Sequence, residues 1–134
     1  MVGGRQDQPY GVALTMNRRG DYNRTISGAG SRSIVAAAKH YGVKATPIKD
    51  VTALRASLKS GHSVVALLRG PASITWPGTT HAITLLGFSS SGATYVRNPY
   101  AGTVNDWYHP DTLWFYQSLD PFDRNAGAVF WQIG

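Results

Sequence analysis

The chain has 134 residues, no cysteine and a formal net charge of +6 at pH 7. This length suits a single hydrophobic core, and we expect one domain over residues 1–134. Without cysteine the chain has no disulfide, no thiolate metal site and no cysteine nucleophile of its own. No apolar run is long enough to span a membrane, and the first residues lack the apolar segment of a signal peptide, so the sequence leaves the compartment open.

The positive charge is concentrated in the first half of the chain. Residues 1–59 hold ten Lys/Arg against three Asp, whereas residues 60–134 hold three Arg against four Asp. A basic half is typical of proteins that meet nucleic acid, anionic lipid or an acidic peptide. The cations are scattered, however, and are not interleaved with aromatic residues that stack on bases. The pattern therefore favours a solvated basic face over a nucleic-acid-binding surface.

Two helices and a loop are predicted at the start of the chain. Residues 10–20 favour a short helix, and residues 21–30 read as a loop rich in Gly and Ser. Residues 31–42 predict a clearer helix, in which alanines fill the middle, a serine caps the start and Gly42 ends the last turn.

A third helix follows an extended segment. Residues 43–48 are extended, and Pro47 favours a sheet edge because proline lacks the N–H that a central strand needs. Residues 50–61 predict a helix that Asp50 caps. Its buried stripe consists of Val51, Leu54 and Leu58.

The second half of the chain has the pattern of strands. Residues 62–69 and 81–88 are apolar runs of strand length, and residues 93–98 follow the second run after the turn signal SSSG. Residues 109–119 favour a short helix or turn, and residues 126–133 a closing strand. Helices that precede mostly antiparallel strands indicate an α+β fold.

One histidine and one asparagine stand out in this strand region. His81 opens the strand 81–88, and Asn98 closes the strand that the SSSG turn pairs with it. We expect the two side chains side by side at the end of the sheet, half in water. A general base needs such an arrangement, because the asparagine oxygen can hold one ring nitrogen while the other faces the reacting group. Geometry alone, however, favours an ordinary hydrogen-bonded surface histidine.

Three motifs favour the catalytic interpretation of His81 over that of an ordinary surface histidine. They are GHSVVALLRG, GTTHAITLLGF and YVRNPYAG. In order and spacing they resemble the C-terminal half of bacteriocin-processing (double-glycine leader) peptidases and their papain-like relatives, and the likeness extends over residues 31–102. It implies a papain-like half-fold with N-terminal helices packed on a mostly antiparallel sheet. By position, His81 matches the histidine of the catalytic triad and Asn98 its third member, where the commoner residue is Asp. The resemblance implies no cofactor.

The nucleophile of that family is missing. There, a cysteine opens an N-terminal helix a few residues after a glutamine that supplies an oxyanion-hole donor. The resemblance places Tyr10 at the cysteine position and Gln6 at that of the glutamine. A phenol with a pKa near 10 is a poor acyl-transfer nucleophile, and its ring would fill the space of the scissile bond. Either the site is degenerate, or the cysteine-bearing helix belongs to a segment upstream of this chain.

No other residue offers a convincing replacement. Thr80 adjoins His81 but should point to the opposite face of the sheet. The serines of the stretch SGAGSRS lack the strained turn of a hydrolase nucleophile and suit caps and turns. The histidines have no paired ligand spacing, so no metal site is predicted. They are His40, His62, His81 and His109.

Three aromatic residues are candidates for substrate contact. Trp76 precedes His81, and Tyr100 and Trp107 follow Asn98. Aromatic rings bury much area with few rotamers lost, which suits recognition of an extended chain. The first hypothesis is therefore a pseudo-peptidase that binds a peptide or unfolded polypeptide, with its oligomeric state open. The second is a cysteine peptidase domain without its nucleophile helix, and the third is a basic nucleic-acid-binding module.

Overall fold

The computed structural model describes residues 30–74, 80–97 and 106–134 of the chain. The described helices are α2 (Ser31–His40), α3 (Val51–Lys59) and α4 (Pro110–Phe115). The strands are β1 (Ala45–Pro47), β2 (Ser63–Leu68), β3 (His81–Leu86), β4 (Thr94–Arg97), β5 (Asp106–Tyr108) and β6 (Phe130–Ile133). The helix predicted over residues 10–20 lies outside the described residues.

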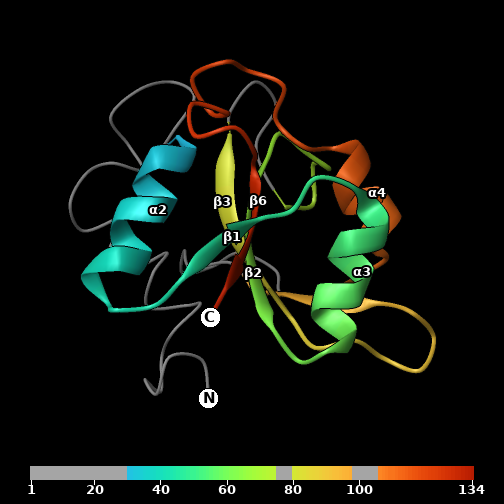
Figure 1. The fold of residues 1–134 in the computed structure, drawn as a ribbon. Coiled ribbons are helices and arrows are strands. Elements are labelled where there is room, and N and C mark those ends of the chain that lie inside the picture. Colours follow the sequence, from blue (N-terminus) through green and yellow to red (C-terminus); the bar gives the residue numbers. More distant parts are fainter. Residues whose placement is uncertain (1–29, 75–79, 98–105) are drawn as a thin grey trace.

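The strands form one six-stranded sheet in the order β1-β6-β2-β3-β4-β5, and every described pairing is antiparallel. Helix α2 lies on one side of this sheet, and α3 and α4 lie together on the other (Figure 1). The predicted α+β fold is confirmed. Pro47 ends β1, an edge strand, where a missing N–H leaves no gap in a ladder.

The core lies at the centre of the sheet. All six residues of β2 are buried, which explains why this strand reads as a continuous apolar run rather than an alternating one. On the side of α3 and α4, the ring of Phe130 in β6 stacks on Trp114 with centroids 4.8 Å apart. Gln132 follows Phe130 by two residues in β6 and therefore lies on the same face. Its amide oxygen accepts a 2.8 Å hydrogen bond from the Ser57 hydroxyl of α3.

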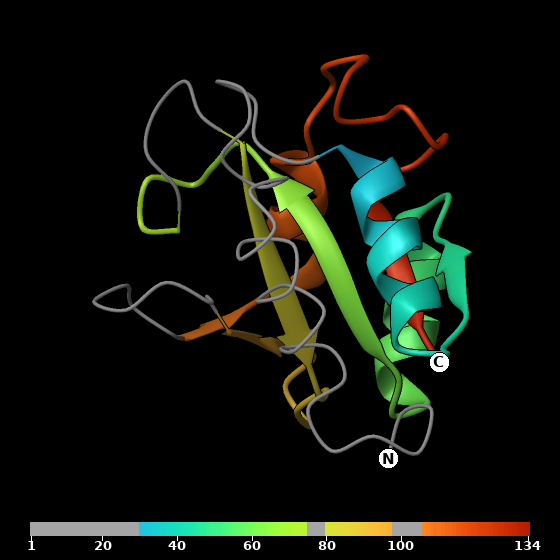
Figure 2. The same ribbon diagram turned by 90° about the vertical axis from the view of Figure 1, so that its left-hand side faces the viewer.

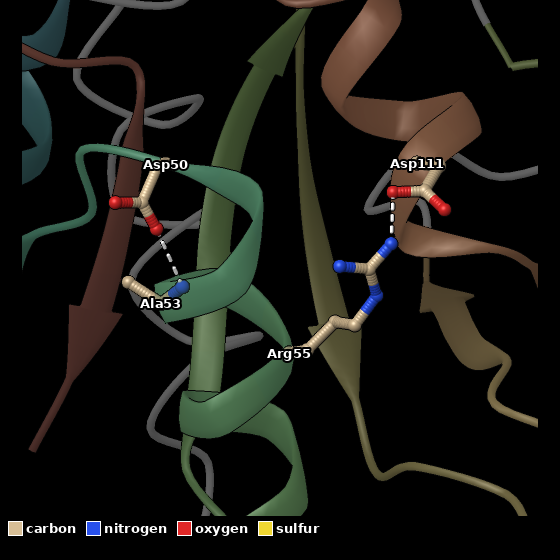
Figure 3. A network of polar contacts seen from close by, with 4 residues as sticks. All are labelled: Asp50, Ala53, Arg55 and Asp111. Atoms are coloured by element: carbon tan, nitrogen blue, oxygen red, sulfur yellow. Dashed lines mark hydrogen bonds and ion pairs between the residues drawn. The ribbon is translucent and has the colours of Figure 1, made fainter.

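Helix α3 begins as the sequence predicts. The Asp50 carboxylate accepts a 2.7 Å hydrogen bond from the backbone N–H of Ala53, so it satisfies one of the free donors of the first turn (Figure 3). Along the same helix, Arg55 forms an exposed ion pair with Asp111 of α4 (Figure 3). Such an exposed pair contributes little to stability, so the buried faces of the helices hold them to the sheet.

The start of α2 differs from its prediction. Ser31 does not cap the helix, because Gly30 is the N-cap and Ser31 is the first helical residue. The cap comes from far along the chain: Asn125 Oδ1 accepts a 2.8 Å hydrogen bond from Arg32 N–H. A Cβ atom on Gly30 would lie 2.6 Å from the backbone oxygen of Phe122, so only glycine fits here. The expected local cap is therefore wrong, and a loop about ninety residues away builds this helix start.

Two further details were not predicted. Strand β5, where no strand was predicted, pairs with β4 and forms the second edge of the sheet. Strand β6 is shorter than the predicted strand over residues 126–133. Among the described residues, no helix has both the length and the apolar character needed to cross a membrane.

Removing the Asp50 cap should weaken α3. Asp50→Ala leaves the Ala53 N–H without its partner, and we expect the free energy of unfolding to fall by about 1 kcal/mol in urea denaturation. Thr52→Ala, at an exposed position of the same turn, should change it by less than about 0.5 kcal/mol. Equal effects of the two substitutions would contradict the assigned cap.

Candidate functional site

His81 is the first residue of β3 and lies next to the central strand. It pairs with Leu68 of β2, and the two long strands run side by side (Figure 2). The exposed fraction of His81 is 7 %, so the expectation of a half-solvated ring is wrong. The position of a residue in a strand predicts its face of the sheet, but not what packs over that face.

The predicted hairpin that follows His81 is confirmed. Strand β4 pairs antiparallel with β3, and Thr84 stands opposite Arg97. In the turn, Ser89 donates its N–H to the carbonyl of Ala93 at 2.8 Å and accepts the Ala93 N–H on its hydroxyl at 3.0 Å. Gly92 takes a positive φ of 85°, which L side chains rarely adopt. Arg97 is the last described residue of β4, and Asn98 lies outside the described residues.

The register determines which side chains share a face. Because successive residues alternate, His81 lies on the same face of β3 as Ile83. Ile83 pairs with Ala66 of β2, and Ala66 pairs with Phe130 of β6. The ring of Phe130 stacks on α4, so the face that carries His81 is the one that α3 and α4 cover.

A buried polar cluster lies directly before His81 in the chain. The Thr80 hydroxyl donates a 2.7 Å hydrogen bond to Asp123 Oδ2, and the Ser118 hydroxyl donates to the same oxygen. Asp123 is fully buried, and its Oδ1 makes no hydrogen bond in the described part of the chain. The Thr80 hydroxyl therefore points to a carboxylate, and its orientation to the face opposite His81 stays a prediction from strand alternation.

The surroundings of Asp123 shift its proton equilibrium. Burial raises the pKa of this carboxyl above its ordinary value of 3.8, since a charge is costly away from water. The hydroxyls of Ser118 and Thr80 oppose that shift because they stabilise the ionised form. Among more distant charges, Asp120 raises the pKa further and Arg69 lowers it. Burial is the largest of these effects, so the net direction is upward.

The sequence contains no strong signal for this cluster. Asp123 stands in the loop PFDRNAG, where an aspartate is typical of an exposed turn. Its partner Thr80 lies 43 residues earlier. Only the paired register of the strands and the return of the chain after α4 bring the two together.

Trp107 is not brought beside His81. It pairs with Tyr95, and Tyr95 stands opposite Leu86, at the other end of β3 from His81. The Trp107 ring is 51 % exposed and meets Tyr95 edge to face at 5.4 Å. The other predicted contacts and site residues lie outside the described residues. They are Gln6, Tyr10, Trp76, Asn98 and Tyr100.

The described part of the chain holds no group of three or more His, Asp or Glu side chains placed to bind a metal ion. His40 lies exposed at the end of α2, and His109 is the N-cap of α4. These positions suit a helix dipole and a helix start.

The chain was compared with known proteins. Residues 8–122 match the model of a family described as the Peptidase_C39 like family. The chain belongs to this family. No curated protein matched it. The match includes Tyr10, His81 and Asn98, and Gln6 lies before its first residue. The molecule is thus a papain-like, Peptidase_C39-like domain in a chain without cysteine.

The raised pKa of Asp123 gives this Peptidase_C39-like domain a pH-dependent stability. Between about pH 4 and the folded-state pKa the folded chain binds more protons than the unfolded chain, so the free energy of unfolding falls as pH rises. Asp123→Asn removes this contribution. We therefore expect urea denaturation to show the wild type losing stability relative to Asp123→Asn as pH rises from about 4 to 7.

Asp111→Asn serves as the control, since it removes an exposed carboxylate and changes the net charge by the same amount. A wild type that gains stability relative to Asp123→Asn over this range would refute the upward direction of the shift.

Proposed function

We propose that this chain is a peptide-binding pseudo-peptidase, a Peptidase_C39-like domain that has lost its nucleophile and kept a site for a polypeptide. The observation that carries the proposal is the family match over residues 8–122 in a chain with no cysteine. Thiolate chemistry is absent from such a chain. An extended peptide, or an unfolded polypeptide with exposed apolar residues, is the partner that this family ancestry favours.

The hydroxyl groups near His81 support the loss of hydrolysis. The side chains of Thr80 and Ser118 are buried and both donate their protons to Asp123. A nucleophile must instead present its oxygen to the substrate and its proton to a base.

The strand register supports a partnership of His81 and Asn98. Thr84 stands opposite Arg97, so the same ladder continued by one residue would set Asn98 opposite Ile83. Asn98 would then share the face of His81, one diagonal step away, which long side chains can bridge. We propose that the Asn98 carboxamide orients the imidazole, as the third member of a triad does. The pair then persists as part of the site although no nucleophile uses it.

The aromatic residues supply the proposed peptide contacts. Trp76 and Tyr100 flank His81 and Asn98 in sequence. Trp107 is exposed but stands level with the far end of β3, so we assign it to peptide residues distant from His81. The bacteriocin-processing relatives suggest a peptide with a Gly-Gly pair, because two residues without side chains can pass a narrow site.

The wild-type chain should bind polypeptide and leave it intact. We expect saturable binding of a fluorescein-labelled peptide with a central Gly-Gly pair, or of carboxymethylated casein, in fluorescence anisotropy, and no cleavage in mass spectrometry. Trp107→Ala should raise the Kd about tenfold, as the loss of an aromatic contact of about 1.4 kcal/mol does. Phe115→Ala, at a more exposed aromatic on α4, is the matched control and should leave Kd unchanged.

The salt dependence of the Kd distinguishes peptide binding from nucleic-acid binding. Raising the salt from about 50 to 200 mM should change the peptide Kd by less than about threefold, whereas a protein that contacts several phosphates loses roughly a thousandfold. Cleavage of either probe would contradict the proposal of a pseudo-peptidase. So would the absence of binding to both probes.

Tyr10→Cys tests whether Tyr10 occupies the place of the nucleophile. A cysteine there should react with iodoacetamide faster than a free thiol at neutral pH, because an adjacent imidazole lowers the thiol pKa. In the double variant Tyr10→Cys/His81→Ala the labelling should slow at least about tenfold, as measured by intact-mass spectrometry. An equal labelling rate in the single and double variants would show that Tyr10 does not lie beside His81, and it would favour a cysteine-bearing helix upstream of this chain.

A further inference from the structure

We propose that Asp123 is a positioning residue that holds the start of β3, and with it His81, in place. The proposal rests on the proposed function, because it assigns His81 to the working site. Asp123 does not act on the ring itself. It binds the side chain of Thr80, the residue directly before His81 in the chain.

The contact is well placed to fix the backbone. Thr80 is 8 % exposed, and its hydroxyl donates at 2.7 Å to a carboxyl with no exposed surface. A threonine side chain has few rotamers, so a bond at its hydroxyl also restricts the backbone that carries it. His81 begins the ladder with Leu68, and Thr80 stands just before that ladder, so a contact other than strand pairing must hold it. The Thr80–Asp123 bond supplies such a contact at the first residue before the strand.

Asp123 is itself anchored to two further elements. Its backbone oxygen accepts a 2.8 Å hydrogen bond from Ser31 N–H at the first turn of α2. Its carboxyl also accepts from Ser118, whose own N–H donates to the carbonyl of Leu67 in β2 at 3.1 Å. The carboxyl thus links Thr80, at the start of β3, to Ser118, which bonds the end of β2, and the backbone oxygen of Asp123 adds the contact to the start of α2. Three elements that are distant in sequence meet at one residue.

A structural bond alone does not account for a carboxylate at this position. An asparagine oxygen would accept both hydroxyl protons without the cost of burying a charge. In the chain as it stands, Asp123 Oδ1 is buried and makes no hydrogen bond among the described residues. Hydrogen bonds to an ionised acceptor are shorter and stronger than neutral ones. When it is ionised, the carboxylate therefore holds the Thr80 hydroxyl more tightly than an asparagine oxygen would.

The state of the His81 ring tests the proposal in the full chain. Long-range ¹H–¹⁵N spectra report the tautomer and the titration of each imidazole. Thr80→Val keeps the shape of the side chain but loses the hydroxyl, so we expect shifted His81 ring resonances and a changed His81 titration midpoint. Thr80→Ser restores the hydroxyl and should restore the wild-type spectrum. The rings of His40 and His109 should stay unchanged in both variants and serve as internal controls.

Asp123→Asn provides a second route if Thr80→Val does not fold. It keeps an acceptor for Thr80 but removes the charge, and it should move the His81 resonances in the same direction by a smaller amount. An unchanged His81 ring in a folded variant, together with a lower Tm, would make the cluster a purely structural contact and overturn the proposal. These spectra need no peptide, so a failure of peptide binding by the wild type remains a separate result that concerns the proposed function alone.

Discussion

The antiparallel pairing of β2 with β3 is the constraint on which the rest of the structure depends. Both strands are buried almost throughout, and buried backbone N–H and C=O groups are costly unless they are paired. A slip of one residue would exchange the two faces of β3 and move Ile83 and Leu85 away from the helices that now cover them. The pairing of His81 with Leu68 is therefore part of a register that the core determines. The packing of the two strands thus fixes the position of the candidate site.

Local signals explain which elements were predictable. The Asp50 cap of α3 and the SSSG turn between β3 and β4 act within a few residues, so the sequence displays them directly. The cap of α2 comes from Asn125 and the partner of Thr80 is Asp123, and neither pair has a local pattern. Strand β5 is short and lies at an edge, where few buried residues mark it. Features created by a long-range return of the chain were the ones that were missed.

In the candidate site, too, local features were predictable and long-range features were not. Strand alternation predicts that His81 and Thr80 point to opposite faces, but it does not predict that the Thr80 hydroxyl meets Asp123. The burial of His81 was not predictable, because exposure depends on what covers a strand end and not on the strand itself. Trp107 follows Asn98 closely in sequence, yet the register sets it level with the far end of β3. Nearness along the chain is a weak guide once strands reverse direction.

The loss of a nucleophile relaxes some constraints on a peptidase fold and leaves others in force. A thiolate requires a neighbouring base with a matched pKa, and that requirement disappears with the cysteine. The packing requirement stays, because a buried histidine or a buried carboxyl without partners destabilises the fold whether or not the protein is an enzyme. The Thr80–Asp123–Ser118 cluster belongs to this second group, since its hydrogen bonds join β3, β2 and α2. Under the proposed function, a strand pair held in this way would offer an extended peptide a surface that loses little conformational entropy on association.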